Sequence, residues 1–224
     1  MTGSVLVEHP ERVPQEVRER LDHLLGPGED MGCARPAALF RLAPATHAEV
    51  ASRPCVRAAG YYHNALVEGP GRRSSVLLGG CDLACRGCWV PHLHPPEVGV
   101  LVPVDRLAEA LLDPAYQRDG VSILGGEPFL QPDGLLALVR ALRARGCPPI
   151  VCYWGRTYDA LLVRARAHPA IGRILDEIDV LIDGPYVEAL ADIAGPWTGS
   201  GNQRVIDLAS TRRAGRVVVL EAAA

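Results

Sequence analysis

Three cysteines in one short loop are the residues of this chain best suited to chemistry. Cys81, Cys85 and Cys88 stand in the spacing C-x3-C-x2-C, directly after the apolar run Val76-Leu77-Leu78. Soft thiolate ligands suit iron–sulfur sites, and three thiolates can hold three irons of a cubane 4Fe-4S cluster. Because this loop supplies no fourth cysteine, one iron would stay open to an exogenous ligand. The spacing therefore predicts a cluster with an open iron.

The same cysteines leave other kinds of site open. Zinc is usually held by four closed ligands, and Cys85 and Cys88 offer one C-x2-C pair. His92 and His94 could complete a tetrahedral site. Disulfides fit poorly, because the cysteine count of seven is odd and the N-terminus lacks the order of a secretory signal. A structural zinc protein and an iron–sulfur electron carrier therefore remain as non-enzymatic alternatives.

Composition restricts the class of protein further. A chain of 224 residues that is 48% apolar can form one good-sized domain plus an appendage. No apolar run approaches the ~20 residues of a membrane span, and a net charge of −3 gives no electrostatic case for nucleic acid. All 23 basic residues are arginine, which excludes a Walker-type phosphate loop and a Schiff-base lysine. We expect a soluble cytoplasmic protein with no membrane or nucleic-acid partner.

The elements that must position the cysteine loop alternate between strand-like and helical runs. The strand-like runs are Ser74–Leu78, Val121–Leu124, Pro149–Tyr153, Val180–Ile182, Arg204–Leu208 and Arg216–Leu220. The helical runs lie near Val104–Leu112, Asp133–Arg145, Tyr158–Ala167 and Ala170–Glu177. Such alternation predicts an α/β fold with a parallel sheet.

Four of the strand-like runs end in glycine-rich or polar segments. These segments are Gly79-Gly80 with the cysteine loop, Gly125-Gly126-Glu127-Pro128, Trp154-Gly155-Arg156-Thr157 and Asp183-Gly184-Pro185-Tyr186. Sites in parallel sheets collect at the C-terminal ends of the strands. The four segments are therefore expected on one rim, where a cluster and its ligand would sit.

The first 65 residues read differently, and we expect a helical N-terminal extension (1–65) followed by a core domain (66–224). Pro14–Leu25 is predicted as one amphipathic helix, and Pro36–Leu42 and His47–Ser52 as two more short helices. Cys33 and Cys55 are too few for a second cluster, and we interpret them as free thiols.

A family resemblance starts just before the cysteine loop. Glu68-Gly69-Pro70-Gly71-Arg72, the run Arg73–Leu78 and the three cysteines resemble the opening of radical S-adenosylmethionine (SAM) enzymes. Within that superfamily the chain is most similar to glycyl-radical-enzyme activases, above all the activating proteins of anaerobic ribonucleotide reductase. The likeness covers roughly Leu66 to Leu208, and Asp179–Tyr186 resembles their Asp-Val-Leu-Val-Asp-Gly run.

The resemblance implies a fold, cofactors and partners. The fold would be a partial (β/α)6 radical SAM barrel, and the cofactors a 4Fe-4S cluster and SAM. Reductive cleavage of SAM would give methionine and a 5′-deoxyadenosyl radical, with the electron supplied by a flavodoxin- or ferredoxin-type donor. The radical would abstract a hydrogen from a glycine Cα of a partner glycyl radical enzyme, such as anaerobic ribonucleotide reductase.

The resemblance also implies roles for individual residues. Cys81, Cys85 and Cys88 would be the cluster ligands and the catalytic residues. Residues expected to bind SAM are Gly87, Trp89, Gly125, Gly126, Glu127 and Asp183. The Glu127 carboxylate suits the SAM ammonium, which is a donor. For Asp183, a role in a buried turn is an equal alternative.

Several residues depart from the activase pattern. Trp89-Val90-Pro91 stands where those activators have His-Asn or Tyr-Asn, and Trp154 replaces a small residue, so we expect it to reshape the pocket. Thr198 and Gly201 replace an arginine and a serine in Trp197–Arg204. These changes, with the N-terminal extension, leave open a small radical SAM enzyme that modifies a peptide or metabolite.

Overall fold

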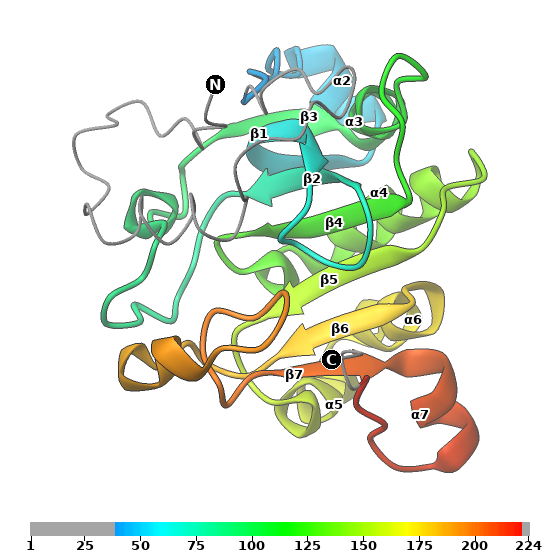
Figure 1. Ribbon diagram of the computed structural model, residues 1–224. Coiled ribbons are helices and arrows are strands. Elements are labelled where there is room, and N and C mark those ends of the chain that lie inside the picture. Colours follow the sequence, from blue (N-terminus) through cyan, green and yellow to red (C-terminus); the bar gives the residue numbers. More distant parts are fainter. Residues whose placement is uncertain (1–38, 221–224) are drawn as a thin grey trace.

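One mixed sheet organises residues 39–220, the part of the chain that the computed structural model describes. Its seven strands have the order β3-β1-β2-β4-β5-β6-β7 (Figure 1). They are β1 (Cys55–Ala65), β2 (Arg73–Leu78), β3 (Val100–Pro103), β4 (Gly120–Gly125), β5 (Ile150–Trp154), β6 (Val180–Asp183) and β7 (Arg204–Asp207). The four strands β2, β4, β5 and β6 are parallel, whereas β1, β3 and β7 run antiparallel to their neighbours.

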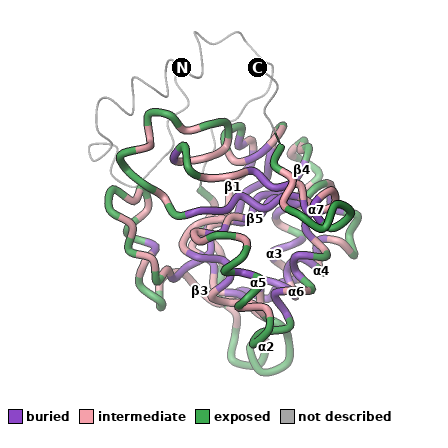
Figure 2. The backbone as a smooth tube through the Cα atoms, turned by 90° about the horizontal axis from the view of Figure 1, so that it is seen from below, coloured by how far each residue is buried: buried purple, intermediate pink, exposed green. Residues whose placement is uncertain are grey.

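Helices cover one face of this sheet (Figures 1 and 2). The helices are α2 (His47–Ser52), α3 (Val104–Leu111), α4 (Pro132–Arg143), α5 (Tyr158–Ala167), α6 (Pro169–Glu177) and α7 (Leu208–Ala214), with 3-10 turns η2 (Pro91–Leu93), η3 (Pro128–Leu130) and η4 (Glu188–Ile193). Their ends follow local chemistry: the Thr157 side chain caps α5, and Gly215 ends α7 at a φ of 62°. No helix within residues 39–220 is long and apolar enough to cross a membrane.

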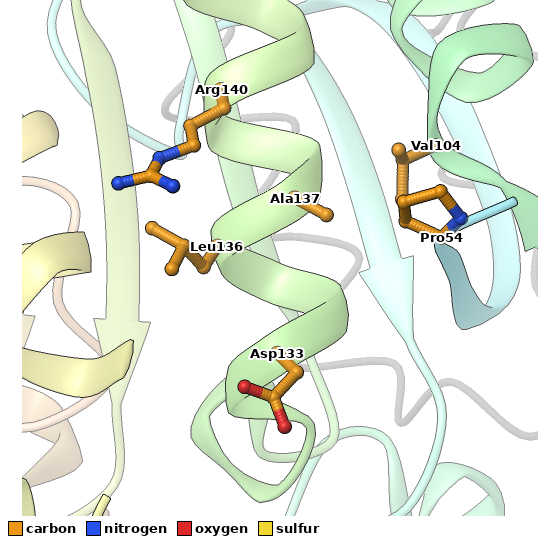
Figure 3. A pocket seen from close by; sticks show the side chains of 6 residues that line it. All are labelled: Pro54, Val104, Asp133, Leu136, Ala137 and Arg140. Atoms are coloured by element: carbon orange, nitrogen blue, oxygen red, sulfur yellow. The ribbon is translucent and has the colours of Figure 1, made fainter. Parts of the chain in front are cut away.

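A groove of about 520 Å³ lies on the helical side, between α3 and α4 (Figure 3). Its lining residues are Pro54, Val104, Asp133, Leu136, Ala137 and Arg140. None of them belongs to the segments that follow the parallel strands, so the groove is separate from the predicted rim.

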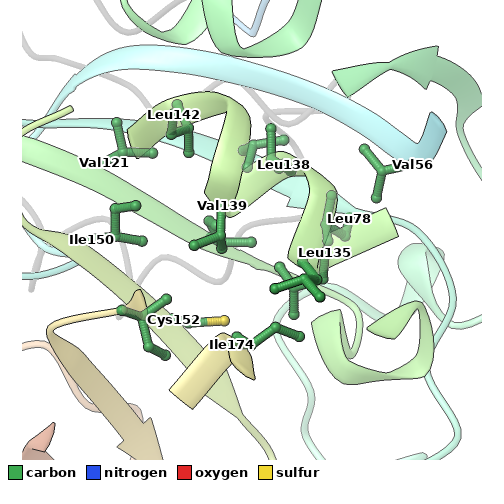
Figure 4. Packing of buried hydrophobic residues seen from close by; sticks show 14 of the residues in the cluster. Val56, Leu78, Val121, Leu135, Leu138, Val139, Leu142, Ile150, Cys152 and Ile174 are labelled. Carbon is green, nitrogen blue, oxygen red and sulfur yellow. The ribbon is translucent and has the colours of Figure 1, made fainter. Parts of the chain in front are cut away.

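The main core lies between the sheet and α3 to α6. Alternate strand residues point to this side, since successive side chains of a strand face opposite ways. Figure 4 shows strand residues Leu78, Val121 and Ile150 in one cluster with Leu135, Val139 and Leu142 of α4. A smaller cluster on the opposite face contains Val151, Val180, Ile182 and Val205.

The predicted α/β class is confirmed, whereas the partial (β/α)6 barrel is not confirmed by the strand pairing within residues 39–220. The parallel part of the sheet has four strands, and Arg204–Asp207 pairs antiparallel with β6. Residues 216–220 form only an isolated bridge, Ile206↔Val219, rather than a sixth strand. The connection from β7 to residues 216–220 consists of little more than α7. This connection is too short for the crossover that a parallel neighbour would require.

Residues 55–65 form β1 rather than part of a helical extension, because they pair with both β2 and β3. The helix predicted at Pro36–Leu42 is wrong over its described part, where Phe40 bridges Tyr61. The helix at His47–Ser52 is confirmed, and Thr46 and Glu49 form its capping box. Pro14–Leu25 and Cys33 lie outside the described residues. The division into domains after residue 65 stays a prediction.

Candidate functional site

The four parallel strands end level with one another. Leu78 lies beside Gly125, and Trp154 lies beside Asp183. In Figure 1 the segment after β2 and the segment after β6 both lie at this end of the sheet. The predicted gathering of these segments on one rim is confirmed.

The cysteine loop turns sharply at two residues in the left-handed region, Ala84 with a φ of 46° and Gly87 with a φ of 71°. The Cys88 N–H donates to the Cys85 carbonyl at 3.2 Å. All three cysteines are free and partly accessible. Free thiols on one accessible loop form a donor set that fits three irons of a cubane.

Gly87 packs against η4, where a Cβ would lie 2.6 Å from Glu188 Oε1. The loop is also held by Arg86, whose Nε lies 3.1 Å from Glu188 Oε2. Gly87, expected to bind SAM, is suited to this turn chiefly by its φ of 71°, a region that favours glycine.

An ion pair joins the cysteine loop to the segment after β5. Arg156 Nη2 lies 3.0 Å from Asp82 Oδ2. Sequence reasoning missed this pair, although the position of Asp82 between two cysteines is a signal that could have suggested it. Gln131 is a second missed residue: its amide bonds the backbone of Arg57 and donates to the Gly79 carbonyl at 3.2 Å.

The end of β4 fits closely against the start of the cysteine loop. The Gly126 N–H donates to the Leu78 carbonyl at 2.8 Å, and the Glu127 N–H donates to the Gly80 carbonyl at 2.7 Å. A Cβ on Gly126 would lie 2.2 Å from Gly80 O. Gly125 has a φ of 114°, a region that favours glycine. The two glycines therefore allow a backbone approach that other residues would prevent.

Glu127 is buried, and both of its oxygens accept backbone hydrogen bonds. Oε1 accepts from the Phe129 N–H at 3.1 Å and Oε2 from the Gly155 N–H at 2.9 Å. Burial raises its pKa to about 7, although these two amides lower it. Its carboxylate thus ties the segment after β4 to the segment after β5.

Asp183 is fully buried at the end of β6. Its carboxylate accepts from the Tyr158 N–H at 2.6 Å and pairs with Arg204, whose Nε lies 2.9 Å from Oδ1. These bonds agree with the buried-turn alternative, and contact of Asp183 with SAM stays a prediction. They join β6 to β7 and to the first turn of α5.

The two tryptophans named in the sequence lie in contrasting places. Trp89 is 68% exposed beside the cysteine loop. Its ring is edge-on to the ring of Tyr186, and the two ring centroids lie 6.3 Å apart. Trp154 is buried on the helical side, where its ring centroid lies 5.4 Å from that of Phe129. The expectation that Trp154 reshapes a pocket on the rim is wrong, because the strand alternation points it into the main core.

The histidines after the loop differ in their contacts. His94 Nε2 lies 3.4 Å from Cys88 Sγ, whereas His92 is exposed. Within residues 39–220, no three side chains of His, Cys, Asp or Glu are arranged to hold a single metal ion. This includes the tetrahedral set considered for zinc, which the structure does not assemble. The same absence holds for the three cysteines, which are proposed to bind a cluster of several irons rather than a single ion.

Comparisons with known proteins find a matching family model and similar proteins. Residues 67–206 match the model of the 4Fe-4S single cluster domain family. The anaerobic ribonucleoside-triphosphate reductase-activating protein of Haemophilus influenzae is 33% identical over 64% of this chain and 92% of its own length. That of Escherichia coli K12 is 34% identical over 65% of this chain and 94% of its own.

Two further comparisons are more limited. A putative glycyl-radical enzyme activating enzyme of Haemophilus influenzae is 38% identical over 39% of this chain and 33% of its own length. Among solved structures, QueE from Escherichia coli is matched over 46% of this chain and 54% of its own, with 18% identity and a TM-score of 0.40. That structural likeness is too weak to carry an argument.

Proposed function

The chain belongs to the family of anaerobic ribonucleoside-triphosphate reductase-activating proteins and contains a 4Fe-4S single cluster domain, and from this we propose that it generates a glycyl radical on a partner enzyme. Its reaction class is that of a radical SAM activating enzyme, and its cofactors are a 4Fe-4S cluster and SAM. When bound, these cofactors supply the reductive cleavage of SAM to methionine and a 5′-deoxyadenosyl radical.

The observation that carries the proposal is the position of the cysteine loop. Three free thiols, Cys81, Cys85 and Cys88, stand where four parallel strands end level. We assign them as ligands of three irons, with SAM at the fourth. Burial raises the pKa of Cys81, and iron coordination would offset this by favouring the thiolate.

The segment Gly125 to Glu127 supports a SAM site next to this loop. Its backbone lies against Gly80 and Leu78, at the start of the cysteine loop. We propose that the SAM amino group binds along this backbone. Because both oxygens of Glu127 accept backbone N–H groups, its carboxylate would position two rim segments rather than act as an unoccupied acceptor.

Exposed apolar side chains beside the cysteine loop support a protein as the substrate. Trp89 and Ile193 are each 68% exposed, and Val187 is also exposed. Apolar groups gathered beside a site suit a protein partner better than a small polar metabolite. We propose a glycyl radical enzyme as that partner, with anaerobic ribonucleotide reductase first among the candidates, and a flavodoxin- or ferredoxin-type protein of the cytoplasm as the electron donor.

Anaerobic reconstitution tests the function directly. We expect about four irons per chain, an electron paramagnetic resonance (EPR) spectrum of the reduced cluster that changes when SAM is added, and 5′-deoxyadenosine formed with dithionite. Cys81→Ala, Cys85→Ala and Cys88→Ala should each lose most of the iron. Cys55→Ala, in β1 away from the loop, is the matched control and should keep it.

Two results would contradict parts of the proposal. A protein that binds zinc, or a cluster whose spectrum ignores SAM, would leave only a non-enzymatic metal protein. SAM cleavage without a glycyl radical on any co-expressed glycyl radical enzyme would instead favour modification of a peptide or metabolite.

A further inference from the structure

The turn that follows the cysteine loop folds back onto the start of that loop. The Gly80 N–H donates to the Leu93 carbonyl at 2.9 Å, and the Cys81 N–H donates to the His94 carbonyl at 3.0 Å. Leu93 is buried, with 2% of its surface exposed, and this anchors η2 in the fold. Residue 94 is therefore held at a fixed place beside the first cysteine.

The side chain of His94 reaches the other end of the same loop. Its Nε2 lies 3.4 Å from Cys88 Sγ, and both residues are partly buried. A thiolate that binds iron has no proton to give and can only accept a hydrogen bond. In the loaded protein the proton of this contact must therefore lie on Nε2, with the imidazole as the donor.

We propose that His94 is a positioning residue that donates a hydrogen bond to the Cys88 thiolate and raises the reduction potential of the cluster. This inference rests on the proposed function only in requiring the cluster itself. Reduction adds negative charge that is shared with the sulfur ligands, so an N–H donor stabilises the reduced state more than the oxidised one. Hydrogen bonds to the sulfurs are among the features that set cluster potentials.

The test is an EPR-monitored redox titration of reconstituted protein, without SAM or partner. We expect His94→Leu to lower the equilibrium constant for one-electron reduction about tenfold, which is about 59 mV. His94→Gln places an N–H donor near the original Nε2 and should restore part of the shift. His92→Ala removes an exposed histidine two residues away and should leave the potential unchanged.

Each outcome decides the inference. A His94→Leu potential within the spread of wild type and His92→Ala would overturn it. Loss of iron from both His94 variants, with His92→Ala fully loaded, would also overturn it and make His94 a purely structural residue. If wild type itself binds no cluster, the proposed function fails; if wild type is loaded and His94 has no effect, only this inference fails.

Discussion

At the scale of single residues, the buried carboxylates of Glu127 and Asp183 accept hydrogen bonds from the backbone of neighbouring segments. Glu127 bonds two amides from different segments, and Asp183 combines an amide with an arginine. Removing a partner from such a buried charged pair usually costs several kcal/mol. Changes at Asp183 should therefore affect stability before they affect cofactor binding.

Glu68 gives a prediction about pH. Burial raises the pKa of Glu68 from 4.5 to about 7. The Ser75 side chain and the positive charge of Arg73 partly offset this rise. Between these values the folded state holds a proton that the unfolded state has lost, so this group makes the free energy of unfolding fall as pH rises. Glu68→Gln should remove this pH-dependent part of the free energy of unfolding, which is worth up to roughly 3 kcal/mol for the full shift. Urea unfolding of wild type and variant at pH 5 and pH 8 measures the difference.

The comparison isolates Glu68 from other titrating groups. Burial lowers the pKa of His63 to about 4, which makes stability rise with pH below about 6.5, the opposite slope. That contribution is common to wild type and variant and cancels in the difference. Glu109→Gln, at an exposed position of α3, should keep the wild-type pH profile; an unchanged profile in Glu68→Gln would contradict the prediction.

At the scale of elements, the end of β4 and the start of the cysteine loop depend on close backbone packing. Two inter-segment hydrogen bonds and the 2.2 Å approach at Gly126 leave no space for a Cβ. Because the atom in the way belongs to backbone rather than to a flexible side chain, the clash moves a whole segment.

Gly126→Ala should therefore destabilise the fold by at least about 2 kcal/mol and reduce iron uptake, since the cysteine loop must shift. Thermal unfolding and iron content measure the two effects. Gly172→Ala in α6 is the matched control, because a Cβ there meets nothing within 4 Å. As an alanine in a helix it should stabilise by about 1 kcal/mol. Equal behaviour of the two variants would show that the packing argument fails.

At the scale of the whole molecule, the sheet has a well-paired centre and weaker margins. β4 and β5 each have parallel partners on both sides and lie under α4 (Figure 4). β3 has four residues and, within residues 39–220, pairs only with β1. The cysteine loop follows β2, which pairs with β4 of this centre, and the chain then continues to β3.

Hydrogen exchange should follow the same order. Amides of β4 and β5 are expected to exchange at the slowest rates, close to those set by global unfolding, and amides of β3 at least about tenfold faster. Exchange followed by mass spectrometry of peptides measures this. Protection of β3 equal to that of β4 would indicate that the margin unfolds only with the centre.

The local features of this chain were determined by its sequence. The C-x3-C-x2-C spacing, the four parallel strands with their glycine-rich ends, and the helices α3 to α6 follow from short-range pattern. Apolar periodicity and turn residues act over a few positions, so they can be read without knowing the neighbours in space. That is why the family and the cluster ligands could be predicted first.

Only the tertiary structure decided the pairings. β1 contains Ala-Ala-Gly in its middle and is a strand because β2 and β3 flank it. The Asp82–Arg156 ion pair and the contact of His94 with Cys88 join residues whose approach depends on how the segments at the rim fold. Glu127 is a further example. From the sequence its carboxylate is expected to bind the SAM ammonium, whereas in the fold it accepts hydrogen bonds from two backbone amides. Contacts between separate segments leave no local periodic pattern, and they become visible only when the chain is folded.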